Sequence, residues 1–83
     1  MKGTVHEINY RRGMVAILTD NGDFSIFELT SEEPLEIGDV VAWKEDTSLG
    51  HAKISNLTQN KQFEVYFQNH WVSKQQLKQQ LLY

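Results

Sequence analysis

The chain has 83 residues, no cysteine and a formal net charge of −3. This length allows a single small domain, and the lack of cysteine excludes a disulfide framework and a thiolate metal site. No apolar run approaches the roughly 18 residues of a membrane span, and no secretory signal is recognisable. We therefore expect a cytoplasmic monomer that does not enter a membrane.

Turn residues divide residues 1–58 into five segments with β character. The first two are 2–9 and 13–19, and Asn21-Gly22, the strongest hairpin signal, leads into the third, 24–29. Pro34 limits any helix before it to one turn. The fourth segment, 40–44, and the fifth, 51–57, flank a polar loop over 45–50. Short strands at this spacing predict an all-β barrel or sandwich.

Residues 59–83 form a C-terminal extension with a different pattern. Alternation of Phe63, Val65 and Phe67 with polar neighbours predicts a sixth strand. Ser73 and Gln76 have the spacing of a capping box, which predicts the start of a short α-helix. Because an isolated helix needs roughly 12–15 residues to be even marginally stable, this shorter one must dock on the rest of the domain.

The segments "MKGTVHEIN…RRGMVAIL…NGDFSIFEL…LEIGDVVAW…GHAKISNLT" resemble a cold-shock domain. The shared features are the opening M-x-G-x-V-x-x-x-N, a basic residue and glycine at the start of the second segment, the Asn-Gly hairpin and an L-x-x-G-x-x-V stretch. The resemblance covers residues 1–58 and implies a five-stranded OB-fold barrel. Residues 59–83 then add a strand and a short α-helix within the same single domain.

The resemblance implies binding of single-stranded RNA or DNA, because cold-shock domains stack bases on aromatic side chains of their first three strands. Most of those aromatic positions differ here. The first RNA-binding motif, usually Lys-Gly-Phe-Gly-Phe, reads Arg-Gly-Met-Val-Ala over residues 12–16. Glu28 stands where the second motif has a base-contacting histidine, so we expect weak or specialised binding. The predicted nucleic-acid-binding residues are Tyr10, Arg11, Arg12, Met14, Ile26 and Lys53.

Charge is unevenly distributed along the chain. Residues 1–41 carry three Lys or Arg and eight Asp or Glu, a balance of −5, whereas residues 42–83 carry five and three, a balance of +2. Phosphate binding usually requires a basic surface. We therefore expect a phosphate-binding patch to draw on the second half as well as on Arg11 and Arg12.

Alternation along the second and third segments leaves an apolar outer face. The residues predicted inside the barrel are Val15, Ile17, Phe27 and Leu29, and the outer face includes Met14, Phe24 and Ile26. A small soluble protein seldom leaves such a face bare. We expect the extension to cover part of it, or a barrel edge beside it, with Phe63, Val65, Phe67, Trp71 and Leu77. Alternatively, Met14, Phe24 and Ile26 bind a protein partner or a second copy, which would make the chain a protein-interaction module.

Two further groups of residues bear on function. Tyr66, His70 and Trp71, near Lys61 and Lys74, are candidates for a substitute stacking site, but we expect Trp71 to pack in the structure because the terminal helix must dock. His6, His51 and His70 lack metal-ligand spacing, and no nucleophile motif or phosphate-binding loop is present. We therefore expect neither an enzyme nor a metal or cofactor site.

Overall fold

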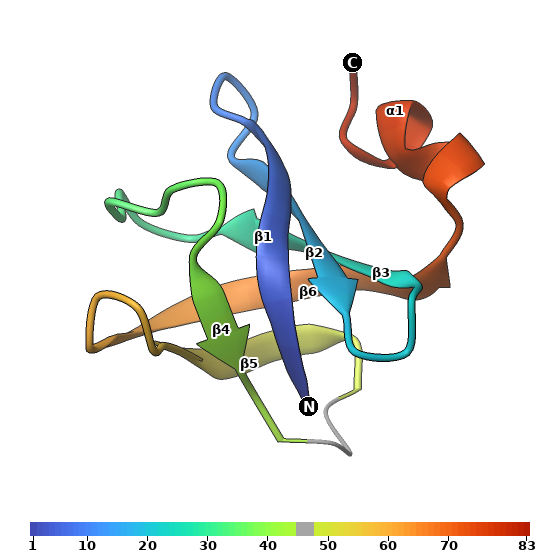
Figure 1. Cartoon of the computed structure of the whole chain (residues 1–83). Helices are drawn as coiled ribbons and strands as arrows, with labels where there is room; N and C mark the ends of the chain where they lie inside the picture. The colour runs from blue at the N-terminus through green and yellow to red at the C-terminus, as the bar shows by residue number, and fades with distance from the viewer. Residues whose placement is uncertain (45–47) are drawn as a thin grey trace.

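The computed structural model describes residues 1–44 and 48–83, so part of the predicted loop 45–50 lies outside the described residues. Antiparallel strands close into a barrel in the order β1-β2-β3-β6-β5-β4 (Figure 1). The strands are β1 (Lys2–Asn9), β2 (Met14–Thr19), β3 (Phe24–Leu29), β4 (Val40–Ala42), β5 (Gly50–Asn56) and β6 (Lys61–Val72). A 3₁₀ turn, η1 (Lys74–Gln76), continues into α1 (Leu77–Gln80). The prediction of an all-β barrel with a short helix is confirmed.

The extension strand β6 is a wall of this barrel and is not an addition outside it. It pairs with β3 from Leu29↔Val65 to Phe24↔Val72, and with β5 from Asn56↔Lys61 to Gly50↔Phe67. A strand of 12 residues is long enough to join both neighbours. The expected five-stranded barrel is therefore corrected to a closed barrel of six strands, which residues 1–58 alone do not complete.

Apolar side chains gather in two clusters on opposite faces of β2 and β3. The interior cluster contains Val5, Ile8, Val15, Ile17, Phe27, Leu35, Val41, Trp43, Ile54, Phe63, Val65 and Phe67. The outer cluster contains Met14, Ala16, Phe24, Ile26, Val72, Leu77 and Leu81. The assignment of Val15, Ile17 and Phe27 to the interior is confirmed, and Leu29 packs against the same cluster.

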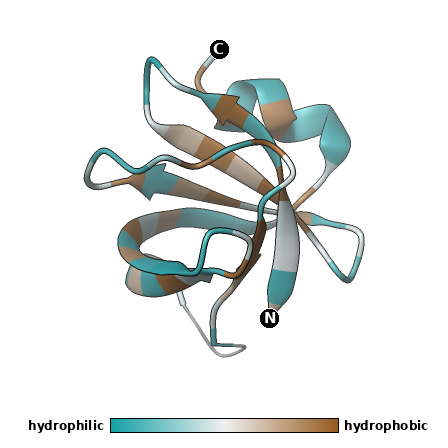
Figure 2. Ribbon diagram, turned by 60° about the vertical axis from the view of Figure 1, so that its left-hand side comes forward, coloured by the Kyte–Doolittle hydropathy of each residue, from teal (hydrophilic) through white to brown (hydrophobic). Residues whose placement is uncertain are grey.

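The extension covers the outer face, but with fewer of the predicted residues. Leu77 lies in the outer cluster as expected, together with Val72 and Leu81. Phe63, Val65 and Phe67 of β6 point into the barrel, because that strand forms its wall. Figure 2 shows the terminal helix as mainly hydrophilic, with short hydrophobic segments. The extension therefore docks on the barrel mainly through Leu77 and Leu81, which form a narrow leucine stripe.

The end of the chain is fastened to β1 by hydrogen bonds. Asn9 Nδ2 donates to the Leu81 carbonyl oxygen over 2.8 Å, and the Tyr83 hydroxyl donates to the Ile8 carbonyl oxygen over 3.1 Å. Desolvation and the negative charge of Glu7 raise the pKa of Tyr83 above its ordinary value of 10.0. Polar contacts thus hold the last residues beside the end of β1.

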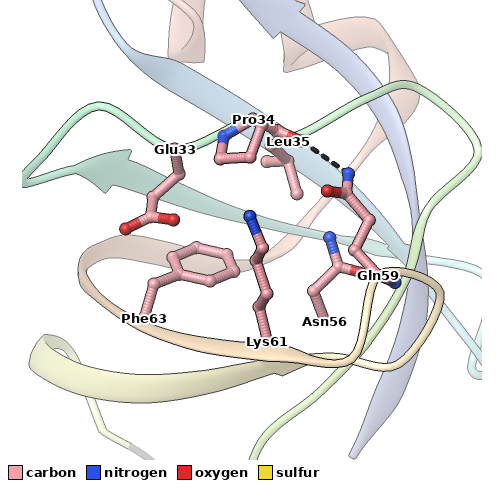
Figure 3. Close-up of a pocket in the computed structure, with 7 residues that line it drawn as sticks. All are labelled: Glu33, Pro34, Leu35, Asn56, Gln59, Lys61 and Phe63. Carbon is pink, nitrogen blue, oxygen red and sulfur yellow. Dashed lines mark hydrogen bonds between the residues drawn. The ribbon is translucent and has the colours of Figure 1, made fainter.

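The loop before β4 is tied to the turn between β5 and β6 through the buried carboxylate of Asp39. Its Oδ2 accepts hydrogen bonds from the Glu36 backbone N–H (3.0 Å), Asn56 Nδ2 (2.9 Å) and Gln59 Nε2 (2.7 Å). Gln59 also donates to the Pro34 carbonyl oxygen, as the dashed line in Figure 3 marks. Desolvation raises the pKa of Asp39, but the hydrogen bonds lower it by more, so the net pKa lies below its ordinary value of 3.8.

Gly3 allows β1 and β2 to approach closely. A Cβ atom at this position would lie 2.5 Å from Ile17 Cγ2 and 2.6 Å from the Leu18 carbonyl oxygen. The Leu18 carbonyl group belongs to the backbone and cannot move aside as the end of a flexible side chain can. We therefore expect Gly3→Ala to lower the free energy of unfolding by about 1–3 kcal/mol in urea denaturation. The neighbouring exposed residue provides a control, and Thr4→Ala should change this free energy by less than about 0.5 kcal/mol. Equal stability of the two variants would contradict the close approach.

Candidate nucleic-acid-binding surfaces

The outer face of β2 and β3, where the resemblance to cold-shock domains places the ligand, is covered by the extension. Met14 is 4% exposed and Ile26 is fully buried, so neither offers a surface to a base while the extension is docked. Phe24 is 4% exposed and equally unavailable to a protein partner. The expectation of an accessible platform at Met14 and Ile26 is therefore corrected, because Val72, Leu77 and Leu81 already occupy it.

The basic turn between β1 and β2, residues 10–13, is exposed and is called the knuckle below. Tyr10 is 72% exposed, and the side chains of Arg11 and Arg12 also face solvent. The turn is closed by a 3.2 Å hydrogen bond from the Arg12 N–H to the Asn9 carbonyl oxygen, and Gly13 supplies a φ of 69°. The structure therefore brings Tyr10, Arg11 and Arg12 together as predicted.

One side of the knuckle is acidic. Tyr10 borders two adjoining surface hollows, and their other lining residues include Glu32, Glu33 and Glu36. Carboxylates repel phosphate, and none of the described residues that line either hollow is basic. A nucleic acid strand is therefore disfavoured on that side of the knuckle.

Lys53 lies on a different part of the barrel surface from the knuckle. It is exposed on β5, which pairs with β4 and β6, whereas the knuckle joins β1 and β2. The residue opposite Lys53 in the β5–β6 ladder is Glu64. On the same two strands, the rings of His51 and Tyr66 are in edge contact with centroids 5.0 Å apart. Lys53 is thus beside an acid and is not brought together with Arg11 and Arg12 by any strand pairing.

Trp71 is the most exposed large apolar side chain among the described residues, with 79% of its surface accessible. Its backbone φ is 54°, in the left-handed region that bulky residues rarely adopt. The Trp71 and His70 rings are in edge contact, with centroids 6.0 Å apart. The expectation that Trp71 packs under the helix is therefore wrong.

Two irregularities in the pairing of β3 with β6 explain this exposure. From Phe24↔Val72 to Ile26↔Asn69, β3 advances two residues while β6 advances three, and an extra β6 residue also lies between Asn69 and Phe67. Each extra residue is a β-bulge, which turns the following side chains to the other face. Strict alternation from Phe67 would place Trp71 inside the barrel, but the extra residue between Phe67 and Asn69 reverses this alternation, and Trp71 itself lies within the second irregularity, between Asn69 and Val72.

Trp71 belongs to a segment of the chain that carries no acidic side chain, although Asp23 precedes Phe24, which pairs with Val72. Residues 65–83 contain no Asp or Glu. The exposed residues that follow Trp71 on η1 and α1 include two pairs at helical i, i+4 spacing, each pair on one side of the helix. We call this the extension surface, and it consists of Trp71, Lys74, Gln75, Lys78 and Gln79. It combines a stacking ring with cationic and amide hydrogen-bond donors.

Among the described residues, no group of three or more His, Cys, Asp or Glu side chains is placed to hold a metal ion. None of the helices in that part of the chain is long and apolar enough to cross a membrane. The chain matches no family model, and no curated protein or solved structure is significantly similar to it.

Proposed function

We propose that this protein binds single-stranded nucleic acid through the extension surface, and not through the outer face of β2 and β3. The observation that carries the proposal is the 79% exposure of Trp71 at a left-handed backbone position. Such a conformation costs about 1–3 kcal/mol and persists only where the surrounding structure maintains it. A solvated tryptophan held in this way is available to stack on a base.

The chemistry around Trp71 suits a single strand. Base stacking on an aromatic side chain contributes about 1–3 kcal/mol and tolerates any sequence, because every base has a π-face. Lys74 and Lys78 supply positive charge to phosphates, and Gln75 and Gln79 supply amide hydrogen-bond donors. Residues 65–83 carry Lys74 and Lys78 and no carboxylate side chain, so the charge of the extension itself favours an anionic ligand despite the net charge of −3 of the whole chain.

A cold-shock-like OB barrel is the proposed ancestry of the fold. The pairings that support it are the β1-β2-β3 meander, the closure of β1 on β4 and the pairing of β4 with β5. An OB barrel joins its third and fifth strands directly, whereas here β6 stands between β3 and β5. In this proposal, β6 is an inserted strand that enlarged the barrel, and the helix after it covers the outer face of β2 and β3, where a cold-shock domain binds its ligand.

Trp71→Ala tests the proposed function directly. We expect its affinity for the ten-nucleotide strands dT10 and rU10 at low salt to fall by about 5- to 150-fold, which corresponds to the loss of about 1–3 kcal/mol of stacking. Fluorescence anisotropy of labelled oligonucleotides measures the affinity. In the wild-type protein, Trp71 fluorescence and the Trp71 indole NMR signal should change during the titration.

Trp71→Phe is the matched control, because it keeps a ring in the same backbone position and should retain most of the affinity. Affinity of the wild-type protein should also fall steeply as salt is raised. If the protein is instead a protein-interaction module that uses Trp71 as an anchor, neither oligonucleotide will shift the indole signal at millimolar concentration. That result would overturn the proposed function.

A further inference from the structure

We propose that one nucleic acid strand crosses the extension helix and contacts both Trp71 and the knuckle arginines, Arg11 and Arg12. This inference rests on the proposed function, since it describes the course of the same ligand. It assigns a single elongated site to two features that lie far apart in the sequence. At one end of the site, Trp71 stacks on a base. Lys74 and Lys78 on the helix contact phosphates along the strand, and Arg11 and Arg12 contact phosphates at the other end.

Docking of the helix places its far end beside the knuckle. The 2.8 Å hydrogen bond from Asn9 to the Leu81 carbonyl oxygen fixes the end of the extension at Asn9, whose own carbonyl oxygen accepts from the Arg12 N–H over 3.2 Å. Met14, at the base of the knuckle, lies in the same apolar cluster as Leu81. Figure 1 shows the C-terminus and the β1–β2 turn at the same upper side of the barrel, with the helix rising from the end of β6.

The sequence of charges along this path favours an anionic strand. From Trp71 the path meets Lys74, then Lys78, and then Arg11 and Arg12. One carboxylate, Asp23, lies near the Trp71 end, since Phe24 pairs with Val72, and two lie near the far end. Glu28, opposite Met14 in the β2–β3 ladder, accepts a hydrogen bond from Gln68 over 3.2 Å, and Glu7 lies close to the hydroxyl of Tyr83.

The alternative course past the knuckle is more acidic. The hollows on the other side of Tyr10 are lined by Glu32, Glu33 and Glu36, and no basic side chain lines them in the part of the chain that the structure describes. A strand that contacts Arg11 and Arg12 is therefore directed over the helix side, where Lys74 and Lys78 supply the positive charge that the described lining of the hollows lacks.

The length of the helix sets the length of the ligand. Residues 73–81 span roughly 13–18 Å at 1.5–2.0 Å per residue in α and 3₁₀ geometry. A stacked strand advances about 3.4 Å per nucleotide, so about four or five nucleotides cross the helix. Further nucleotides are needed to contact Trp71 at one end and the knuckle arginines at the other. A four-nucleotide strand is too short to reach both ends, and a ten-nucleotide strand is long enough.

This difference gives a length-dependent test with the double variant Arg11→Ala/Arg12→Ala and the probes dT4 and dT10. We expect the double variant to bind dT10 about tenfold more weakly than the wild type at low salt, and to bind dT4 unchanged. For dT10, the slope of log affinity against log salt should decrease in magnitude by roughly 1.4, the value for two lost single-strand phosphate contacts. Trp71→Ala should weaken both probes.

The control Lys2→Ala/Lys53→Ala removes the same charge from exposed positions off the path and should change neither probe by more than about twofold. If the arginine variant binds dT10 as well as the wild type while Trp71→Ala still weakens binding, the crossing path is wrong and the proposed function stands. An arginine variant that loses dT4 and dT10 equally also overturns the path. If Trp71→Ala affects neither probe, both proposals fail.

Discussion

Leu81→Ala is expected to lower the free energy of unfolding by about 2–5 kcal/mol and to expose the outer face of β2 and β3. Leu81 is fully buried in the outer cluster with Leu77, and large-to-small substitutions at such sites lose both transfer free energy and packing. The helix it anchors has only four α-helical residues and cannot persist undocked. Urea denaturation measures the loss, and binding of a dye specific for apolar surface reports the uncovered face.

Leu82→Ala is the matched control for this prediction. Leu82 is the adjacent leucine, and it is 53% exposed and not part of the outer cluster. Its truncation should change the free energy of unfolding by less than about 0.5 kcal/mol and should leave dye binding unchanged. Equal effects of the two variants would mean that the leucine stripe does not hold the helix.

Asp39→Ala is expected to lower the free energy of unfolding by about 2–4 kcal/mol. Asp39 is 4% exposed, and its removal leaves the donors of Asn56, Gln59 and the Glu36 backbone without their shared acceptor. A buried donor left unsatisfied costs about 1–3 kcal/mol. Thermal and urea unfolding both measure the loss. Asp23→Ala, at a half-buried carboxylate of the β2–β3 turn, is the comparison and should cost less, because it loses only a local contact with Thr19.

The same carboxylate makes stability depend on pH in a defined direction. The pKa of Asp39 is lower in the folded protein than its ordinary value of 3.8, so the unfolded chain takes up its proton first as pH falls. The contribution of Asp39 is therefore complete above about pH 5 and is lost progressively as pH falls from there through the folded-state pKa. We expect Asp39→Asn to flatten this part of the acid-unfolding profile. An unchanged profile would show that other carboxylates control acid unfolding.

Local signals in the sequence were sufficient for the strands and the helix start. Asn21-Gly22 marks the turn between β2 and β3, and the predicted segments 2–9 and 24–29 coincide with β1 and β3. Period-two alternation also placed Val15 and Phe27 inside. These features depend on neighbours within a few residues, which is why one sequence is enough to predict them.

The neighbours of each strand in the sheet, and the positions of the β-bulges, were not predictable from these local signals. Alternation identifies β6 as a strand but not its place between β3 and β5, because a strand with one buried face fits an edge or a closed wall equally well. The exposure of Trp71 depends on two extra residues relative to β3, which alternation within β6 does not reveal. The Asp39 network was missed as well, since its partners come from positions 17 and 20 residues later in the chain.

The position of β6 also sets the order of events during synthesis. The ribosome makes β3 and β5 before β6, so a nascent chain that ends at residue 58 has no partner for either open strand edge. Unpaired edges invite association with other chains. The pairing of β3 with β6 joins residues about 40 positions apart, and such non-local contacts form slowly. Barrel closure is therefore a late step that follows emergence of the last strand from the exit tunnel.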